Sequence, residues 1–342
     1  MSGVSGATID PAEEVLRPVT AVQRLHRLLH VYPALGPAVV LGGAILTFGL
    51  LNSRFLLPNN LSLITQQVAV VGALSAGQTL IILTGGVDLS VGSAMVFTSM
   101  IMANSVLALG LPGPIALLLG LLVGGLAGLT NGLLVTRLRL PPFIVTLGTW
   151  HVFTALTLLV SAGQTIQQKN IPDILLWTGS TISIGTIRIT TGVVLMLVLY
   201  AGLAFVLRNT AWGKHVYAVG NDTEASRLAG ISTDRLLLSV YAVAGLIFGL
   251  TAWILIGRVG AASPNAAVDA NLDSITAVVI GGTSLFGGRG VLIGSLLGAL
   301  IVGVFRNGLA LAGVDVLYQT LAVGVLVIVA VAIDQWIRRV RS

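Results

Sequence analysis

The chain has 342 residues, of which 55% are hydrophobic and only 9% are charged. Soluble domains carry roughly 25% charged residues, so this composition excludes a soluble globular protein and indicates a polytopic membrane protein. Cations that anchor cytoplasmic loops explain the net charge of +6, and no basic patch alternates with aromatic residues as in a nucleic-acid interface. The lack of cysteine excludes disulfides, thiolate catalysis and cysteine-based metal sites.

The first 30 residues do not read as a signal peptide, because charged side chains are spread through them and no short apolar core precedes a cleavage site. Apolar residues recur there at helical spacing, at Val15, Val19, Val22, Leu25 and Leu29. An amphipathic helix on the membrane surface explains this pattern, and a frayed tail with chance periodicity explains it equally well. We therefore expect residues 1–30 to be a cytoplasmic segment, with the interfacial helix as one of two interpretations.

Apolar runs long enough to cross the hydrocarbon core, which takes about 20 residues, follow along the rest of the chain. The candidate spans are residues 33–51, 61–83, 89–110, 114–135, 143–161, 190–207, 237–256, 272–286, 291–312 and 316–334. The eighth is short and interrupted by glycine. We expect an all-α transmembrane bundle of about ten spans with broken, glycine-rich helices, in which residues 31–336 form the membrane domain and residues 337–342 a basic cytoplasmic tail.

Ten spans place both termini on one side of the membrane, and the cations indicate that this side is the cytoplasm. Thirteen cations then lie inside, namely Arg17, Arg24, Arg27, Arg137, Arg139, Arg208, Lys214, Arg227, Arg235, Arg289, Arg338, Arg339 and Arg341. Four lie outside, namely Arg54, Lys169, Arg188 and Arg258, and Arg306 falls within a span. The positive-inside rule favours this orientation. In the largest outer connection, residues 162–189, the alternation TISIGTIRIT predicts a small β-hairpin.

A charged stretch, residues 208–235 (RNTAWGKHVYAVGNDTEASRLAGISTDR), interrupts the apolar chain on the cytoplasmic side. Its centre predicts one very short helix, with Asn221 as the N-cap, Glu224 as its capping-box partner and Gly230 as the left-handed closing residue. One face of this helix carries Ala225, Leu228 and Ala229. Two helical turns are not stable alone in water, so we expect the helix to dock on another protein.

Two glycine-broken segments interrupt apolar runs in the two halves of the chain, LTGGVDLSVGSAM at residues 83–95 and VVIGGTSLFGGRG at residues 278–290. They share an order of residues: Gly85, Gly86, Leu89 and Gly92 correspond to Gly281, Gly282, Leu285 and Gly288. Paired broken helices of this kind point to a transport site. A glycine-rich chain also produces such a short internal sequence match by chance.

Polar side chains inside or beside the spans are candidates for a solute path. Asp88 and Ser90 follow the first glycine pair, where they either cap the next helix at the membrane edge or line the path. Amides, hydroxyls and a Trp face suit a neutral polyol, and they equally suit hydrogen bonds between helices. The candidate path comprises Gln78, Gly85, Gly86, Asp88, Ser90, Asn131, Thr146, Trp150, Gly281, Gly282 and Thr283. We find no pair of opposite charges within the spans that would form an ion relay, which argues against an ion-coupled carrier.

Nucleotide-binding and catalytic motifs are missing from the sequence. Gly213 and Lys214 are followed by His215 instead of Ser or Thr, and no glycine lies five residues before Gly213, so there is no phosphate-binding P-loop. The H-E-x-x-H and G-x-S-x-G motifs and a catalytic pair within the spans are also absent. We therefore expect no enzyme activity, metal or bound cofactor in this chain, and any ATP-driven transport would need a partner that hydrolyses ATP.

Five motifs resemble the permease subunits of ribose-type ATP-binding-cassette (ABC) importers: GGVDLSVGS, RLRLPPFIVTLGTW, NTAWGKHVYAVGNDTEASRLAGI, ITAVVIGGTSLFGGRG and AIDQWIRR. Their order and spacing match from about residue 22 to residue 340, and AWGKHVYAVGNDTEASRLAGI, RVGAASP and AVAIDQWIR are similar to the fructose-importing branch. The resemblance implies a homodimeric permease of the bacterial inner membrane. It also implies a two-domain cytoplasmic ATPase that binds ATP and Mg, and a periplasmic binding protein that delivers a monosaccharide such as fructose or ribose.

The resemblance also implies that this chain has a cytoplasmic coupling loop, which contacts the ATPase. In this chain the loop corresponds to Gly220, Asn221, Asp222, Glu224, Ala225, Arg227, Leu228 and Gly230. Relatives often have a second acidic residue or a glycine where this chain has Asn221. No sugar-contact motif can be transferred from the family. The alternative function is a self-contained secondary carrier. Such a carrier would transport a small neutral polar solute without an ATPase.

Overall fold

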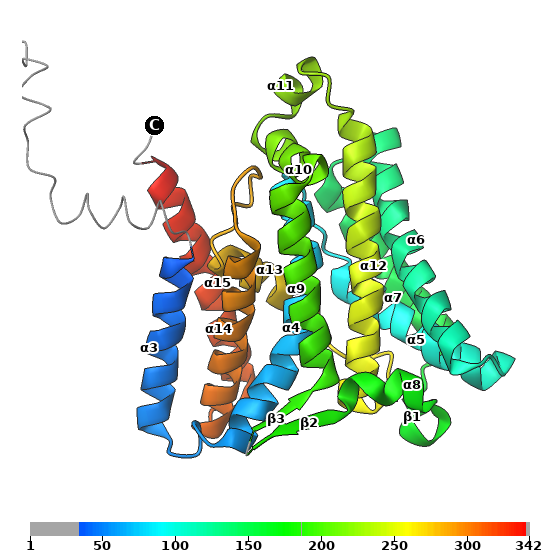
Figure 1. The fold of residues 1–342 in the computed structure, drawn as a ribbon, viewed down its shortest axis with the longest axis vertical. Helices are drawn as coiled ribbons and strands as arrows, with labels where there is room; N and C mark the ends of the chain where they lie inside the picture. Colours follow the sequence, from blue (N-terminus) through cyan, green and yellow to red (C-terminus); the bar gives the residue numbers. More distant parts are fainter. Residues whose placement is uncertain (1–33, 186, 340–342) are drawn as a thin grey trace, which may run out of the picture.

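The computed structural model describes residues 34–185 and 187–339, which form a helical bundle (Figure 1). Its longer helices are α3 (Leu35–Leu51), α4 (Pro58–Leu83), α5 (Val91–Leu109), α6 (Gly113–Arg137), α7 (Pro142–Ser161), α9 (Thr191–Asn209), α12 (Thr233–Val259), α13 (Ala270–Ile280), α14 (Leu292–Leu311) and α15 (Val316–Arg339). All of them except α13 follow the predicted spans to within a few residues, and the expected all-α class is confirmed. The interfacial helix predicted near residues 15–29 lies outside the described residues, as do residues 340–342.

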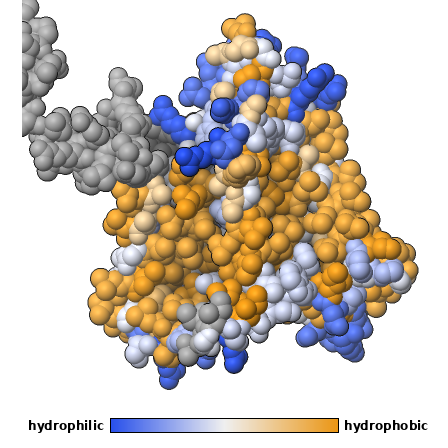
Figure 2. Space-filling view, in the orientation of Figure 1, coloured by the Kyte–Doolittle hydropathy of each residue, from blue (hydrophilic) through white to orange (hydrophobic). Residues whose placement is uncertain are grey.

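The surface has the apolar band of a membrane protein. Among the described helices, α4, α5, α6, α7, α9, α12 and α14 are long and apolar enough to cross a membrane, and shorter apolar helices cover Leu35–Leu51, Ala270–Ile280 and Val316–Val325. Figure 2 shows this band between two polar ends. The chain is therefore a multi-pass membrane protein.

The eighth predicted span, residues 272–286, is wrong as a continuous helix. The helix α13 has 11 residues, or about 16 Å at 1.5 Å per residue, which is half of the hydrocarbon core. It ends at Ile280 because Gly281 and Gly282 close it. Helix α12 ends and α14 begins at opposite ends of the bundle (Figure 1). Residues 260–291 therefore make one crossing from an irregular segment and a half-length helix.

Short elements cover the lower end of the bundle in Figure 1, between α7 and α9. They are β1 (Ile166–Gln167), η1 (Gln168–Asn170), α8 (Asp173–Leu176), η2 (Trp177–Gly179), β2 (Thr181–Ile184) and β3 (Ile187–Thr190). Strands β2 and β3 pair antiparallel with Thr181 opposite Thr190, which confirms the predicted hairpin. Strand β1 pairs with β4 (Ala261–Ala262), so the chain after α12 is attached to the same layer.

Glycines bring α6 and α12 into backbone contact. They recur every fourth residue, as Gly120, Gly124, Gly128 and Gly132 on α6 and as Gly245 and Gly249 on α12. A Cβ at Gly128 would lie 2.1 Å from the carbonyl oxygen of Tyr241, and one at Gly124 would lie 2.6 Å from that of Gly245. Small residues at this spacing let helices in lipid gain van der Waals packing at short range. We expect α6 and α12 to move as one body.

Helix α4 lies at the centre of the bundle. Nearly all of its residues from Val68 to Leu83 are buried, and it packs against α9, α12, α13 and α14. A displacement of the end of α4 at Leu83 would therefore change its contacts with helices from both halves of the chain.

Candidate functional site

The charged stretch 208–235 contains two short helices where the sequence predicted one. They are α10 (Ala211–Asn221) and α11 (Thr223–Leu228), which project from the upper end of the bundle between α9 and α12 (Figure 1). Thr210 caps α10, since its hydroxyl accepts a hydrogen bond from the backbone N–H of Gly213 at 3.2 Å. This region is the candidate coupling site.

The predicted N-cap of the docking helix is wrong by one residue. Asp222 has the extended backbone of an N-cap, and its Oδ1 accepts a hydrogen bond from the N–H of Ala225 at 2.9 Å. Asn221 cannot take this role because it is the last helical residue of α10. The predicted capping box is wrong too, since Glu224 forms an ion pair with Arg227 at 2.6 Å. Gly230, at φ +87°, closes α11 as predicted.

The outer face of α11 is uncovered in the described chain. From Asn221 to Gly230 every residue except Ser226 is exposed, and Leu228 is 83% exposed. Ala225 and Ala229 are exposed beside it. A capped two-turn helix with a bare leucine at a polar end of the molecule has the character of a docking element.

The end of α10 packs directly on the backbone of both glycine-broken segments. A Cβ at Gly220 would lie 1.8 Å from the carbonyl oxygen of Leu83 and 2.6 Å from the backbone nitrogen of Gly288. The N–H of Gly288 donates to the Leu83 carbonyl at 2.9 Å. Three segments thus meet at one point: the end of α10, the end of α4 and the loop 281–290. We call this point the junction.

A tyrosine strengthens the junction. The hydroxyl of Tyr217, on α10, donates a hydrogen bond to the carbonyl oxygen of Gly290 at 3.1 Å. Burial raises the pKa of this phenol, so it stays protonated and remains a donor. We therefore expect a displacement of α10 to move the loop 281–290, through Tyr217, as well as α4, through Gly220.

The two glycine-broken segments share a local geometry, shifted by one residue from the correspondence in the sequence. Gly85 ends α4 at φ +81° and Gly282 ends α13 at φ +83°. After each, the next N–H returns to a helical carbonyl five residues earlier, from Gly86 to Ile81 and from Thr283 to Val278. Gly85 thus corresponds to Gly282, and the expected match with Gly281 is out of register. A Cβ at Gly287 would lie 2.8 Å from the nitrogen of Gly85, so the segments lie against each other.

Four of the predicted path residues form a buried cluster beside the junction. Asp88 Oδ1 accepts from the backbone N–H and the hydroxyl of Ser90 at 2.7 and 2.6 Å. Asn131 Nδ2 donates to Asp88 Oδ2 at 3.1 Å and to the Ser90 hydroxyl at 2.9 Å. The hydroxyl of Thr146 donates to the carbonyl of Val87 at 3.1 Å. These bonds attach the connection between α4 and α5 to α6 and α7.

Asp88 does not cap α5, so the interpretation of this residue as a helix cap at the membrane edge is wrong. The residue in the N-cap position is Ser90, which makes no side-chain capping bond. An oxygen from another helix reaches this turn: the N–H of Gly92 donates to Asn271 Oδ1, on α13, at 2.5 Å. Sequence reasoning missed Asn271 because the two residues are 179 positions apart and only the fold brings them together.

The other predicted path residues do not converge on one cavity. Gln78 is fully buried, and neither of its amide atoms has a hydrogen-bond partner among the described residues. Gly281 contacts α14, where its Cβ would lie 2.4 Å from the carbonyl oxygen of Gly294. Trp150 lines a cavity of about 220 Å³ together with Asn271. The predicted path is therefore divided among a packed cluster, the junction and this small cavity.

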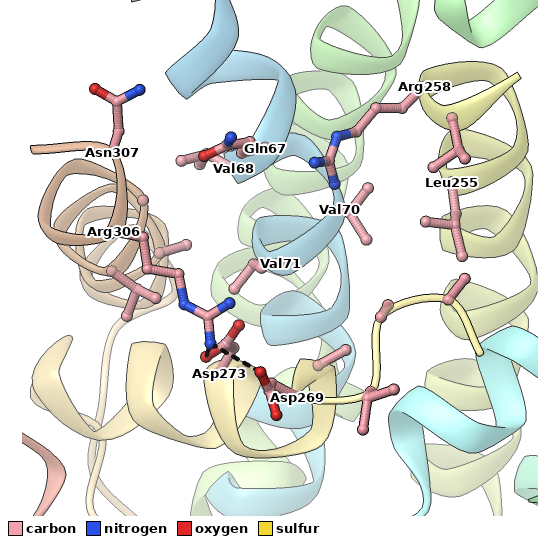
Figure 3. A pocket seen from close by; sticks show the side chains of 18 of the residues that line it. Gln67, Val68, Val70, Val71, Leu255, Arg258, Asp269, Asp273, Arg306 and Asn307 are labelled. Atoms are coloured by element: carbon pink, nitrogen blue, oxygen red, sulfur yellow. Dashed lines mark hydrogen bonds and ion pairs between the residues drawn. The ribbon is translucent and has the colours of Figure 1, made fainter. Parts of the chain in front are cut away.

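A larger cavity, of about 540 Å³, was missed by sequence reasoning (Figure 3). Its polar lining includes Gln67, Arg258, Asp269, Asp273, Arg306 and Asn307. Arg306 forms an ion pair with Asp273 at 2.8 Å, so the expectation that the spans contain no pair of opposite charges is wrong. The partners are 33 positions apart on different helices. A lone arginine inside an apolar run was the available signal, because such a charge needs a counterion.

Comparisons with known proteins agree on one family. Residues 60–331 match the family described as branched-chain amino acid transport system / permease component. The chain is 50% identical to the fructose import permease protein of Rhizobium meliloti, over 94% of this chain and 91% of that protein. It is 37% identical to the ribose import permease protein of Bacillus subtilis, over 89% and 94% of the two chains, and 35% identical to that of Escherichia coli K12, over 83% and 88%.

Proposed function

The chain belongs to the family of branched-chain amino acid transport system permease components, and we propose that it is the permease of an ABC importer for a monosaccharide such as fructose or ribose. The proposal draws on the import permeases for fructose and ribose that are similar to it over nearly the whole chain. In this proposal the chain forms the passage across the bacterial inner membrane. A separate two-domain ATPase binds and hydrolyses the ATP.

The proposed orientation puts α11 in the cytoplasm. The described chain begins in α3 and ends in α15 at the same end of the bundle as α10 and α11 (Figure 1), and the positive-inside rule makes this end cytoplasmic. A periplasmic binding protein would then dock on the opposite end, over residues 162–189. A second copy of the chain would complete the passage, surrounded by lipid, and nucleic acid has no role.

The observation that carries the proposal is the connection from an exposed docking helix to the membrane helices. Leu228 on α11 is exposed, and in this proposal it enters a cleft of the ATPase. Behind it, α10 rests through Gly220 on the carbonyl of Leu83 and on the nitrogen of Gly288. Closure of an ATPase dimer would move α11 and α10, displace the ends of α4 and α13, and tilt the bundle. Alternating access would follow from that tilt.

The test is a charge placed on the docking face. In Leu228→Asp, a carboxylate would have to be desolvated in the ATPase cleft, so uptake of radiolabelled fructose and ribose by vesicles that contain the whole importer should fall to background. Co-purification of the ATPase should be lost, and the amount of permease in the membrane should stay unchanged because Leu228 is exposed. The control is Thr223→Asp, which adds the same charge in the first turn of α11, where an acidic residue is favourable.

A helix break gives an independent version of the same test. Leu228→Pro should also abolish uptake while the protein remains in the membrane. Uptake at the normal rate by either Leu228 variant would mean that α11 does not dock on the driving subunit.

A secondary carrier is the second candidate, and the ion pair between Arg306 and Asp273 favours it. Charged pairs inside membrane helices occur in ion-coupled carriers. The discriminating measurement is sugar uptake by purified permease in vesicles with an imposed proton or sodium gradient and no ATPase. Uptake under those conditions would replace the importer proposal with the carrier.

A further inference from the structure

We propose that the cavity lined by Gln67, Arg258, Asp269, Asp273, Arg306 and Asn307, here called the outer cavity, is the binding station for sugar within this chain. The inference rests on the proposed function, because it assigns residues to the passage of that sugar. The cavity lies toward the end of the bundle opposite α11, since Arg258 is close to the end of α12 that is remote from α11. Its volume of about 540 Å³ falls in the range of small-molecule sites.

The charges of the outer cavity balance. Arg306 Nη2 lies 2.8 Å from Asp273 Oδ1 and 3.6 Å from Asp269 Oδ2. Arg258 is the remaining charged residue of the lining, so two carboxylates face two guanidinium groups. Charges inside a membrane domain are costly and mark solute pathways. A balanced set suits an uncharged solute, because an ion would meet as much repulsion as attraction.

Two polar side chains of the lining have unused hydrogen-bonding capacity. Across the part of the chain that the structure describes, Gln67 and Arg258 make no hydrogen bond or ion pair. Figure 3 shows Arg258 reaching from α12 toward α4, beside Val70. A guanidinium group offers two parallel N–H donors and an amide offers both donors and acceptors, which matches adjacent hydroxyls on a sugar ring. Valines of the same wall, such as Val68, provide contact for the ring C–H groups.

Both carboxylates of the outer cavity lie at the start of α13, the half-length helix. Asp269 precedes α13 and Asp273 lies in its first turn. Discontinuous helices hold the substrate sites of many transporters because their free ends supply polar groups at depth in the membrane. The other end of α13 closes at Gly282, next to the junction. One helix of 11 residues therefore connects the proposed sugar station to the part of the chain that α10 displaces.

The absence of cysteine from the chain allows a direct test by site-specific labelling. Gln67→Cys, in the assembled importer, should react with a charged, membrane-impermeant methanethiosulfonate, and the reaction should abolish the uptake that this variant retains. Binding protein loaded with D-fructose or D-ribose, with ATP, should slow labelling about tenfold relative to sugar-free binding protein with ATP. Gln66→Cys is the matched control: Gln66 does not line the cavity and is hydrogen-bonded to Ser62, so its labelling should not depend on sugar.

Three results would overturn the inference. Labelling of Gln67→Cys at a rate independent of both sugars would mean that sugar does not occupy the cavity. Reaction only with a lipid-soluble maleimide would mean that lipid fills it. A disulfide between the introduced cysteines of two copies, formed without loss of uptake, would mean that the cavity is a contact between copies.

Transport kinetics separate this inference from the proposed function. Gln67→Leu and Arg258→Met remove groups without described partners, so both variants should fold, reach the membrane in normal amount and lower sugar uptake roughly tenfold. Gln66→Leu should transport normally. Leu228→Asp should lose both stimulated ATPase activity and uptake. Normal uptake by both cavity variants would overturn the cavity assignment alone, whereas absence of ATP-driven sugar uptake by the unmodified importer would overturn both proposals.

Discussion

A single methyl group at Gly220 tests whether the junction transmits force. Gly220 lies in α10 with a helical backbone, so Gly220→Ala changes no dihedral preference against the fold. The new Cβ would lie 1.8 Å from the carbonyl oxygen of Leu83 and 2.6 Å from the nitrogen of Gly288. Ordinary contacts of a methyl carbon begin near 3.4 Å, so the backbone of α10 must move away from α4 by more than 1 Å. This movement would stretch the hydrogen bond from Gly288 to Leu83.

The size of the effect follows from three contributions. Overpacking against backbone atoms costs about 1–3 kcal/mol, and the strained hydrogen bond adds about 1 kcal/mol. Replacing glycine by alanine inside a helix returns about 1 kcal/mol. We expect a net destabilisation of about 1–3 kcal/mol, together with a loss of coupling that is larger than the loss of stability.

The measurement compares Gly220→Ala with Gly202→Ala. Gly202 lies in α9, and a Cβ there would meet no atom within 4 Å, so only the favourable helix propensity remains. Gly220→Ala should lower the melting temperature of the purified permease and should weaken the stimulation of ATPase activity by loaded binding protein, whereas Gly202→Ala should do neither. If the two variants are equally stable and equally active, the close packing at the junction is not what connects α10 to the membrane helices.

Three other substitutions test the packing around the site. Gly128→Ala should destabilise the permease by about 1–3 kcal/mol, because its Cβ would lie 2.1 Å from the Tyr241 carbonyl oxygen, while Gly148→Ala, with open space around it, should leave the melting temperature unchanged. Asp222→Ala should increase amide exchange across α11 without changing the melting temperature, and equal exchange in the Asn221→Ala variant would contradict the cap assignment. Asp88→Ala should destabilise the permease by about 2–4 kcal/mol because three buried donors lose their acceptor; Asp88→Asn, which keeps one acceptor oxygen, should recover part of the lost melting temperature.

The positions of the helices could be predicted because apolar run length is a local property of a chain. The hairpin of β2 and β3 was predictable for the same reason, since alternation along ten residues is visible without a partner. The end of α13 is a local property too: the apolar run extends through Gly281 and Gly282, but Gly282 takes the left-handed conformation that commonly ends a helix. The glycine pair is therefore the local signal in the sequence for a half-length helix.

The errors at the site arose where packing decides between near-equal local choices. Asn221 and Asp222 are both good N-caps, and the choice depends on where α10 ends. Helix α10 reaches Asn221 because Gly220 packs on Leu83 and Gly288, which are far away in sequence. The ion pair of Asp273 with Arg306 and the contact of Asn271 with Gly92 likewise join segments that only the fold brings together.

The attachments of α10 explain how one short helix could drive two bodies. Trp212 Nε1 donates to the hydroxyl of Ser239 on α12 at 2.8 Å, and α12 is packed backbone to backbone with α6. Tyr217 attaches the same helix to Gly290, ahead of α14. Helix α10 therefore contacts a body of α6 with α12 on one side and the α13–α14 segment on the other. Because Trp212 and Tyr217 lie on the same helix, we expect a movement of α10 to act on both bodies. The outer cavity, which has walls from α4, α12, α13 and α14, lies between them.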